Sequence, residues 1–169
     1  MSRPGIEIKV VGLEKVLQAL AKQIREIPER NNKGIIKGGF VILRAAQQKC
    51  PVQYGNLKAS GFLVWPTGNV GASPAWKNGA TKKNGMQVQV DTGRMNQDHA
   101  SAMSFLRDRV KEETKNKGVG IGFSAYYALY VHENIEASHR VGEARFLQNA
   151  VKEQSARVLK IIASEARKK

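Results

Sequence analysis

Residues 30–51 have the sequence RNNKGIIKGGFVILRAAQQKCP, and no other stretch constrains the fold of this chain more strongly. Its apolar side chains recur at helical spacing in two interleaved rows, which are Ile36, Phe40 and Leu43, and Ile35, Ile42 and Ala46. That period predicts a helix from about residue 30 to residue 49, because Pro51 cannot continue it.

Three glycines, Gly34, Gly38 and Gly39, lie inside this predicted helix. Each lowers helix propensity by about 1 kcal/mol relative to alanine. We therefore expect them to allow another backbone to approach closely; a kink or a later start of the helix is the alternative.

The remaining chain alternates between strand and helix patterns. Apolar residues that alternate or form short runs predict strands at 6–10, 57–65, 86–90 and 118–123, the last with glycines that allow close packing. Helical spacing predicts helices at 13–24, 97–115 and 125–132, with Ser124 as the cap of the third, and a long final helix after Gly142. Between them, Asp91-Thr92-Gly93 predicts a turn, and the Gly-, Pro- and Lys-rich residues 66–85 predict a long loop.

Length and composition describe one domain of ordinary globular character. The chain has 169 residues, of which 41% are hydrophobic and 25% charged. No apolar run approaches the roughly 18 residues of a membrane span, and the N-terminal residues do not resemble a secretory signal. Cys50 is the single cysteine, so no internal disulfide can form, which fits synthesis in a reducing cytoplasm.

The net charge of +14 is the one unusual property of the composition. A positive field of this size attracts nucleic acid, anionic surfaces or an acidic protein. The basic residues are spread along the sequence, and the short clusters Lys82-Lys83 and Arg167-Lys168-Lys169 are the candidate contacts for DNA or a partner. A solvated basic surface with no dedicated ligand is the alternative.

The residues that could carry catalysis do not form a known pattern. The three histidines, His99, His132 and His139, are not spaced as metal ligands, and Gly118-x-Gly-x-Gly lacks the third glycine of a dinucleotide loop. His132 beside Glu133 is the best catalytic candidate, but adjacent helical residues point apart, which argues against a direct pair. We therefore expect no catalytic residue, no metal and no cofactor; a hydrolase would need a pocket converging on His132 or His99.

Aromatic residues suggest a second class of function. Tyr54, Trp65 and Trp76 lie near lysines in the sequence and could form a stacking surface for single-stranded nucleic acid. They do not alternate regularly with basic residues, and no nucleic-acid-binding motif is present. Nonspecific contact with a nucleic-acid backbone does not require such a motif, so a small basic nucleic-acid-binding protein is the alternative function.

Two segments of the chain carry a resemblance to a known family. The first has Gly12-Leu13 at the start of a helix and then Ala45-Ala46-x-x-x-Cys50-Pro51-Val52-Gln53-Tyr54-Gly55-Asn56-Leu57-x-x-Ser60. The second is Tyr126-Tyr127-Ala128-Leu129-Tyr130-Val131-His132-Glu133, followed by Gly142-Glu143-Ala144-Arg145-Phe146-Leu147 and a helix. Together they resemble the minor capsid, neck or tail-completion family of tailed double-stranded DNA bacteriophages. Gln53-Tyr54 stands where that family usually has Asp-Thr.

The resemblance implies a fold and a set of assembly residues. The fold would be α+β, a small antiparallel or mixed sheet packed by long N-terminal and C-terminal helices, in a single domain over residues 1–169 with a loop-rich insertion at 66–117. The residues that match the family motif and would act in assembly are Pro51, Gly55, Leu57, Tyr126, Tyr127, Tyr130, His132, Glu133, Phe146 and Leu147. Phe146 and Leu147 would anchor the last helix to the tyrosines.

The function implied is structural rather than enzymatic. Such a protein joins head to tail at the neck of a virion, as several copies in a ring, after assembly in the cytoplasm of the bacterial host. Its partners would be other copies of itself, the portal or adaptor, and the tail-terminator or tail-tube proteins, with nonspecific contact to packaged DNA and no membrane. The loop at 66–85 and the basic tail are the candidate contacts with neighbours.

Overall fold

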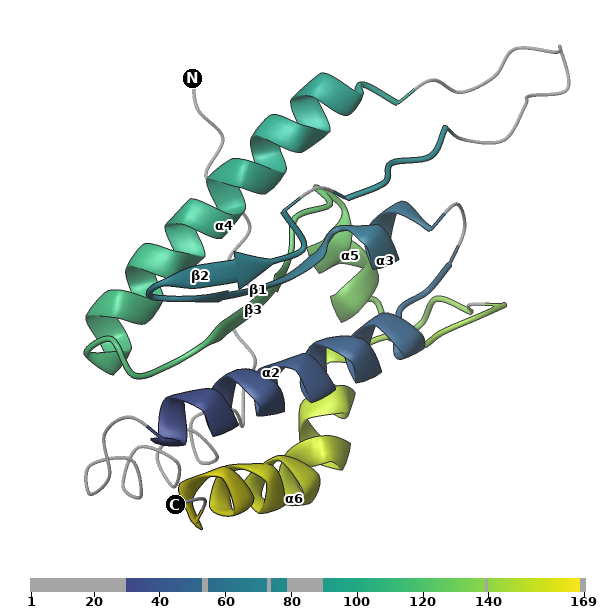
Figure 1. The fold of residues 1–169 in the computed structure, drawn as a ribbon. Coiled ribbons are helices and arrows are strands. Elements are labelled where there is room, and N and C mark those ends of the chain that lie inside the picture. Colours follow the sequence, from purple (N-terminus) through teal and green to yellow (C-terminus); the bar gives the residue numbers. More distant parts are fainter. Residues whose placement is uncertain (1–29, 53–54, 73, 79–89, 139, 168–169) are drawn as a thin grey trace, which may run out of the picture.

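The computed structural model describes residues 30–52, 55–72, 74–78, 90–138 and 140–167 (Figure 1). The described elements, in chain order, are α2 (Arg30–Lys49), α3 (Asn56–Ala59), β1 (Gly61–Trp65), β2 (Gly68–Val70), α4 (Thr92–Thr114), β3 (Gly120–Phe123), α5 (Ala128–Glu133) and α6 (Phe146–Arg167). The predicted elements at 6–10 and 13–24, and all of 86–90 but its last residue, lie outside the described residues. None of the described helices is long and apolar enough to cross a membrane.

The sheet has three antiparallel strands in the order β2-β1-β3. Leu63, in the middle of β1, is opposite Val70 of β2 on one side and Ile121 of β3 on the other. Since β1 is the central strand, it has neighbours along both edges and helices over both faces, which explains why all five of its residues are apolar or glycine. The α+β class, with a small antiparallel sheet and long helices, is confirmed.

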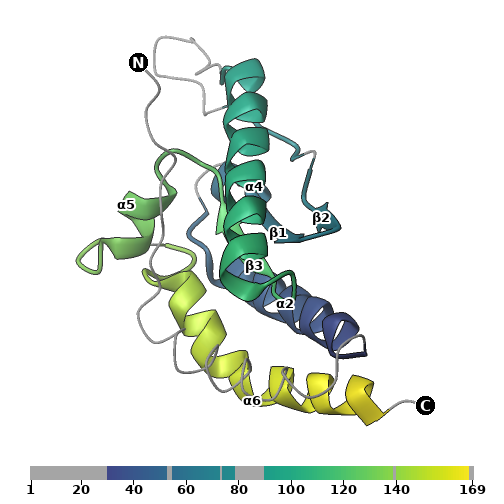
Figure 2. The same ribbon diagram turned by 90° about the vertical axis from the view of Figure 1, so that its left-hand side faces the viewer.

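Successive side chains of β1 point to opposite faces of the sheet and enter two different cores. Leu63 belongs to the core shared with α2 and α6, whereas Phe62 and Val64 pack with Met103 and Val110 of α4. Figures 1 and 2 show the resulting layers: α4 crosses one face of the sheet, α2 lies on the other, and α6 packs along α2.

The glycines of α2 permit the close packing that their positions predict. A Cβ atom on Gly34 would lie 2.9 Å from the Cα atom of Ile162, and one on Gly38 would lie 2.7 Å from a methyl of Val158. Gly39 faces the sheet instead, where a Cβ atom would lie 2.7 Å from Leu63. Ile162 and Val158 belong to α6, which therefore runs antiparallel to α2. The expectation that the glycines allow another backbone to approach closely is confirmed.

The glycines of β3 are equally constrained by what covers them. A Cβ atom on Gly120 would lie 2.7 Å from the side chain of Leu106 in α4, and one on Gly122 would lie 2.6 Å from the ring of Phe62. The prediction of a tightly packed strand here is confirmed, with its described bounds at Gly120–Phe123.

Two sequence predictions were wrong around the first strands. Residues 57–65 are not one strand: α3 occupies Asn56–Ala59, and β1 begins only after Ser60. Gly55 precedes α3 with φ of +87°, a conformation that costs other residues energy, so the chain turns there. The predicted loop at 66–85 is interrupted at its start by β2, which forms a hairpin with β1.

The helices α4 and α5 begin at different residues from those predicted. The sequence predicts that Asp91 lies in a turn, but in the structure it is the N-cap of α4. Its carboxylate accepts a hydrogen bond from the Arg94 amide (2.9 Å). The helix therefore starts at Thr92 rather than at residue 97. In α5 the N-cap residue is Tyr127, and Ser124 caps no helix.

Candidate functional site

The two sequence segments that carry the family resemblance meet at the end of α2. The amide of Glu143 donates a hydrogen bond to the carbonyl of Lys49 (2.8 Å). Gly142, with φ of +88°, crosses so close that a Cβ atom there would lie 2.5 Å from the Pro51 nitrogen. Pro51 thus ends α2 at the place where the segment leading into α6 crosses over it. We call this region, comprising residues 49–52, 55–60, 124–134 and 141–149, the junction.

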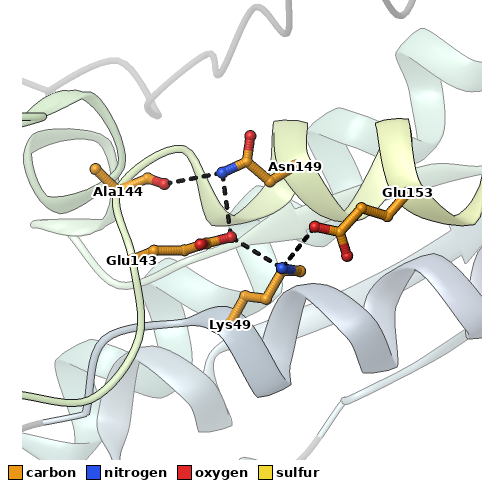
Figure 3. A network of polar contacts seen from close by, with 5 residues as sticks. All are labelled: Lys49, Glu143, Ala144, Asn149 and Glu153. Carbon is orange, nitrogen blue, oxygen red and sulfur yellow. Dashed lines mark hydrogen bonds and ion pairs between the residues drawn. The ribbon is translucent and has the colours of Figure 1, made fainter.

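A network of charged and polar groups closes the junction on its solvent side (Figure 3). The Lys49 ammonium lies 3.0 Å from a Glu143 carboxylate oxygen and 2.8 Å from one of Glu153 in α6. Asn149 donates hydrogen bonds to the same oxygen of Glu143 (3.1 Å) and to the carbonyl of Ala144 (3.4 Å). Hydrogen bonding to Glu153 and Glu143 raises the pKa of Lys49, and the bond from Lys49 lowers the pKa of Glu143. The network therefore ties α2, the crossing segment and α6 together.

The turn of the first segment is held by a second set of bonds. Leu57 is buried, and the Ser60 hydroxyl donates to its carbonyl at 2.8 Å. The Ser60 carbonyl in turn accepts from the amide of Ser124 at 3.2 Å, which joins this turn to the chain two residues before the second segment. The Gln53-Tyr54 pair, where the sequence departs from the family pattern, lies outside the described residues.

The tyrosines of the second segment differ in exposure, although the rings of Tyr126 and Tyr127 pack edge-on with centroids 5.1 Å apart. Tyr127 is half-buried against the core, and burial raises its pKa. Tyr126 and Tyr130 are instead 75% and 72% exposed. The expectation that Phe146 and Leu147 anchor α6 to these tyrosines is therefore wrong for the two exposed ones.

The anchor of α6 is formed mainly by other rings. Phe146 is fully buried, and its ring packs edge-on against Phe123 and His132, with ring centroids 5.0 Å apart in both pairs. Leu147 lies in the same core. The two residues thus fix the start of α6 to β3 and α5, and leave the exposed tyrosines available for contacts outside the chain.

His132 and Glu133 form a direct pair, against expectation. The Nδ1 atom of His132 lies 2.7 Å from a carboxylate oxygen of Glu133, whose side chain is exposed whereas that of His132 is buried. The other ring nitrogen, Nε2, is buried and has no hydrogen-bond partner among the described residues. A general base must reach its substrate, and this nitrogen is covered.

His99 is a structural residue that the sequence did not reveal. It is buried in α4, and its Nδ1 and Nε2 atoms each lie 2.5 Å from an oxygen, of the Ser124 hydroxyl and the Gly71 carbonyl respectively. Burial lowers its pKa, so the neutral ring can donate to Gly71 and accept from Ser124. The histidine therefore fastens α4 to the sheet, and no spacing pattern in the sequence signals a pairing between residues so far apart.

The predicted aromatic stacking surface is not assembled. Trp65 packs on the α2 side of the sheet, where its ring centroid is 6.4 Å from that of Phe40. Trp76 packs edge-on to His99 at 6.0 Å on the α4 side and donates to Asn96. Tyr54 lies outside the described residues. The two described tryptophans are thus on opposite sides of the sheet and cannot hold successive bases of one strand.

The remaining candidates are inert or undescribed. Cys50 is fully buried, and burial raises the pKa of its thiol to about 12, so it is a core side chain, as predicted. No group of side chains within the described residues could hold a metal ion. Lys82, Lys83, Lys168 and Lys169 lie outside the described residues, and Arg167 is exposed at the last turn of α6.

The chain matches no family model, no curated protein and no solved structure.

Proposed function

We propose that the chain is a structural virion protein of a tailed bacteriophage, a neck or tail-completion component that joins the head to the tail. The assignment to this family rests on the two sequence segments. What supports it is the junction: Pro51 and Gly142, from different segments, are in contact, and Ser60 is bonded to Ser124. Residues of a motif that shapes one structural unit are expected to meet in this way.

The exposed side of α5 is the proposed contact with neighbouring subunits. A shallow depression there is lined by Tyr126, Leu129, Tyr130, Glu133 and Asn134. Tyrosines combine a large apolar area with a polar tip and are enriched at protein interfaces. In a ring, this patch would meet a different patch of the next copy, because the contact is head-to-tail. The portal or adaptor and the tail-terminator or tail-tube proteins would lie on the two sides of the ring.

The test is complementation of particles that lack this protein. Deletion of the gene should give separate filled heads and tails by electron microscopy, and the intact protein should restore joined particles. The double variant Tyr126→Ala, Tyr130→Ala should fail to restore joining, and native mass measurement should show that it does not form the oligomer of the intact protein.

A matched control is Phe105→Ala, which removes another exposed ring, on α4, and should restore joining fully. Joined, infectious particles in the complete absence of the protein would refute the proposal. Equal loss with the Phe105 and the tyrosine variants would refute the role of the α5 side.

A further inference from the structure

Within the described residues, the positive charge is concentrated on the side of the fold formed by α2 and α6. Helix α2 has five basic and no acidic residues, and α6 has four basic and two acidic residues, a joint net charge of +7. Helix α4, on the other face of the sheet, has four basic and four acidic residues and no net charge. The sequence spreads its charges along the chain, but packing of α2 against α6 brings many of the basic ones together.

These basic residues border a groove between the two helices. The groove is lined by Lys37 and Val41 of α2 and by Arg157, Lys160, Ile161, Ser164 and Glu165 of α6. Lys33 and Arg44 continue the row of Lys37 along α2, because spacings of four and seven residues return to the same side of a helix. We call Lys33, Lys37, Arg44, Arg157 and Lys160 the basic face.

Little of this charge is neutralised within the chain. Glu165 is paired with Lys37 at 2.8 Å, and Glu153 with Lys49 at 2.8 Å. The other four members of the basic face are exposed and form no ion pair with any described residue: Lys33, Arg44, Arg157 and Lys160. The basic face therefore has uncompensated positive charge on both sides of the groove.

The chemistry of the basic face fits phosphates better than a protein partner. Lysine, arginine and serine side chains supply most contacts to the nucleic-acid backbone. Apart from Val41 and Ile161, the apolar lining of the groove comes from the aliphatic stems of its lysine and arginine side chains. None of the described lining residues is aromatic, whereas protein interfaces are enriched in aromatic side chains. From Lys33 to Arg44 the helix rises about 16 Å, a length over which duplex DNA presents about ten phosphates.

We propose that the basic face binds the phosphate backbone of duplex DNA without sequence preference. This goes beyond the proposed function, because the contact is a property of the isolated chain and does not require a virion. The expected dissociation constant at physiological salt is in the nonspecific range, about 10⁻⁴ to 10⁻⁶ M.

The test is fluorescence anisotropy of a labelled duplex of arbitrary sequence with the full-length protein, at several salt concentrations. If the four unpaired cations each contact a phosphate, the logarithm of the binding constant should fall with that of salt with a slope of about −4. Arg157→Gln with Lys160→Gln should reduce the size of that slope by about two and weaken binding. Lys33→Gln with Arg44→Gln should do the same from the α2 side.

The matched control is Lys77→Gln with Arg94→Gln, which removes the same charge from exposed positions outside the basic face and should leave binding within about twofold. Equal weakening by the control would overturn the proposal, as would binding of polyglutamate but not of duplex. Sequence-specific binding in the nanomolar range would also overturn it, and would favour the dedicated nucleic-acid-binding protein over the virion component. Failure of the intact protein to bind duplex would overturn this proposal and would leave the particle-joining test unaffected.

Discussion

The two faces of the sheet are covered in different ways. On one face, α2 and α6 pack so closely that Gly34 has no room for a side chain, and the core there includes the fully buried Phe146. On the other face a single helix, α4, covers a smaller core and is fastened by the buried His99. The face covered by α2 and α6 depends on tight apolar packing. The face covered by α4 depends on the two hydrogen bonds of His99 and on a smaller apolar contact. They should therefore respond differently to mutation and to pH.

The largest difference should appear when a core side chain is removed from each face. Phe146→Ala should lower the free energy of unfolding by about 3–5 kcal/mol, because it leaves a cavity between Phe123 and His132. Met103→Ala, on the α4 face, should cost about 2 kcal/mol, since Met103 lies at the edge of its core and is 7% exposed. Urea unfolding of both variants measures the difference. If Phe146→Ala abolishes folding, Phe146→Leu, at about 1 kcal/mol, should still cost more than the volume-conserving Met103→Leu on the α4 face, and equal losses would remove the distinction.

Glycine replacements should have opposite signs on the two faces. Gly34→Ala should destabilise the protein by about 1–3 kcal/mol, because the new methyl group meets the backbone of Ile162. Gly93→Ala, in the first turn of α4, should instead be neutral or stabilising by up to about 1 kcal/mol, since only an Asp91 oxygen at 3.4 Å lies near and alanine favours the helix. Thermal melts of the two variants test this, and a stabilising Gly34→Ala would show that α2 and α6 can separate without cost.

The start of α4 should depend on its local cap. Asp91→Ala removes the acceptor for the Arg94 amide and should cost about 1 kcal/mol, with hydrogen exchange increasing first in the first turn of α4. Asp91→Asn keeps an acceptor oxygen and should retain most of the stability. Unchanged exchange in Asp91→Ala would mean that packing alone holds this end.

The smallest effect should be a difference in pH response. Burial lowers the pKa of His99 below its ordinary value near 6.5, so the unfolded chain takes up a proton before the folded chain does. The α4 face should therefore lose stability as the pH falls below about 6.5, until the folded histidine is protonated as well. The contribution of Glu143, whose pKa is lowered by Lys49, should be present above its ordinary pKa near 4.5 and lost only as the pH falls through the lower folded value.

Melting temperatures measured between pH 7.5 and pH 5 should show the loss of stability due to His99 but not the loss due to Glu143, which begins at lower pH. His99→Asn should flatten the dependence in that window, and Lys49→Met should leave it unchanged. A wild-type protein whose stability did not change between pH 7.5 and pH 5 would contradict the clamp role of His99.

Local patterns predicted the helices well and the short strands less well. The period of apolar residues placed α2 to within its described bounds, because an amphipathic stripe twenty residues long is hard to mistake. The apolar run at 57–65 predicts one strand, since four helical residues followed by five strand residues have no distinct period of their own. Asp91 is typical both of a turn and of a helix cap, and only the helix that follows it decides between the two.

The candidate site was predictable in its residues but not in its geometry. The sequence identified the two segments of the junction, and it predicted that Cys50 is buried. It led to the wrong conclusion for His132 and Glu133, because the flexible glutamate side chain can bend back although the two Cα–Cβ bonds diverge. It also could not show that Tyr126 and Tyr130 are exposed, because exposure depends on which elements pack against a six-residue helix.

Local periodicity, side-chain size and composition were enough to predict the long helices, the close packing at the glycines and the total positive charge, and the resemblance of two sequence segments implied the α+β class. Three features depend on tertiary packing: α4 is fastened to the second face of the sheet through His99, Pro51 and Gly142 meet, and the charge gathers on α2 and α6. Each of these joins residues far apart in the chain. Their proximity follows from how whole helices pack on the sheet, which no local pattern encodes.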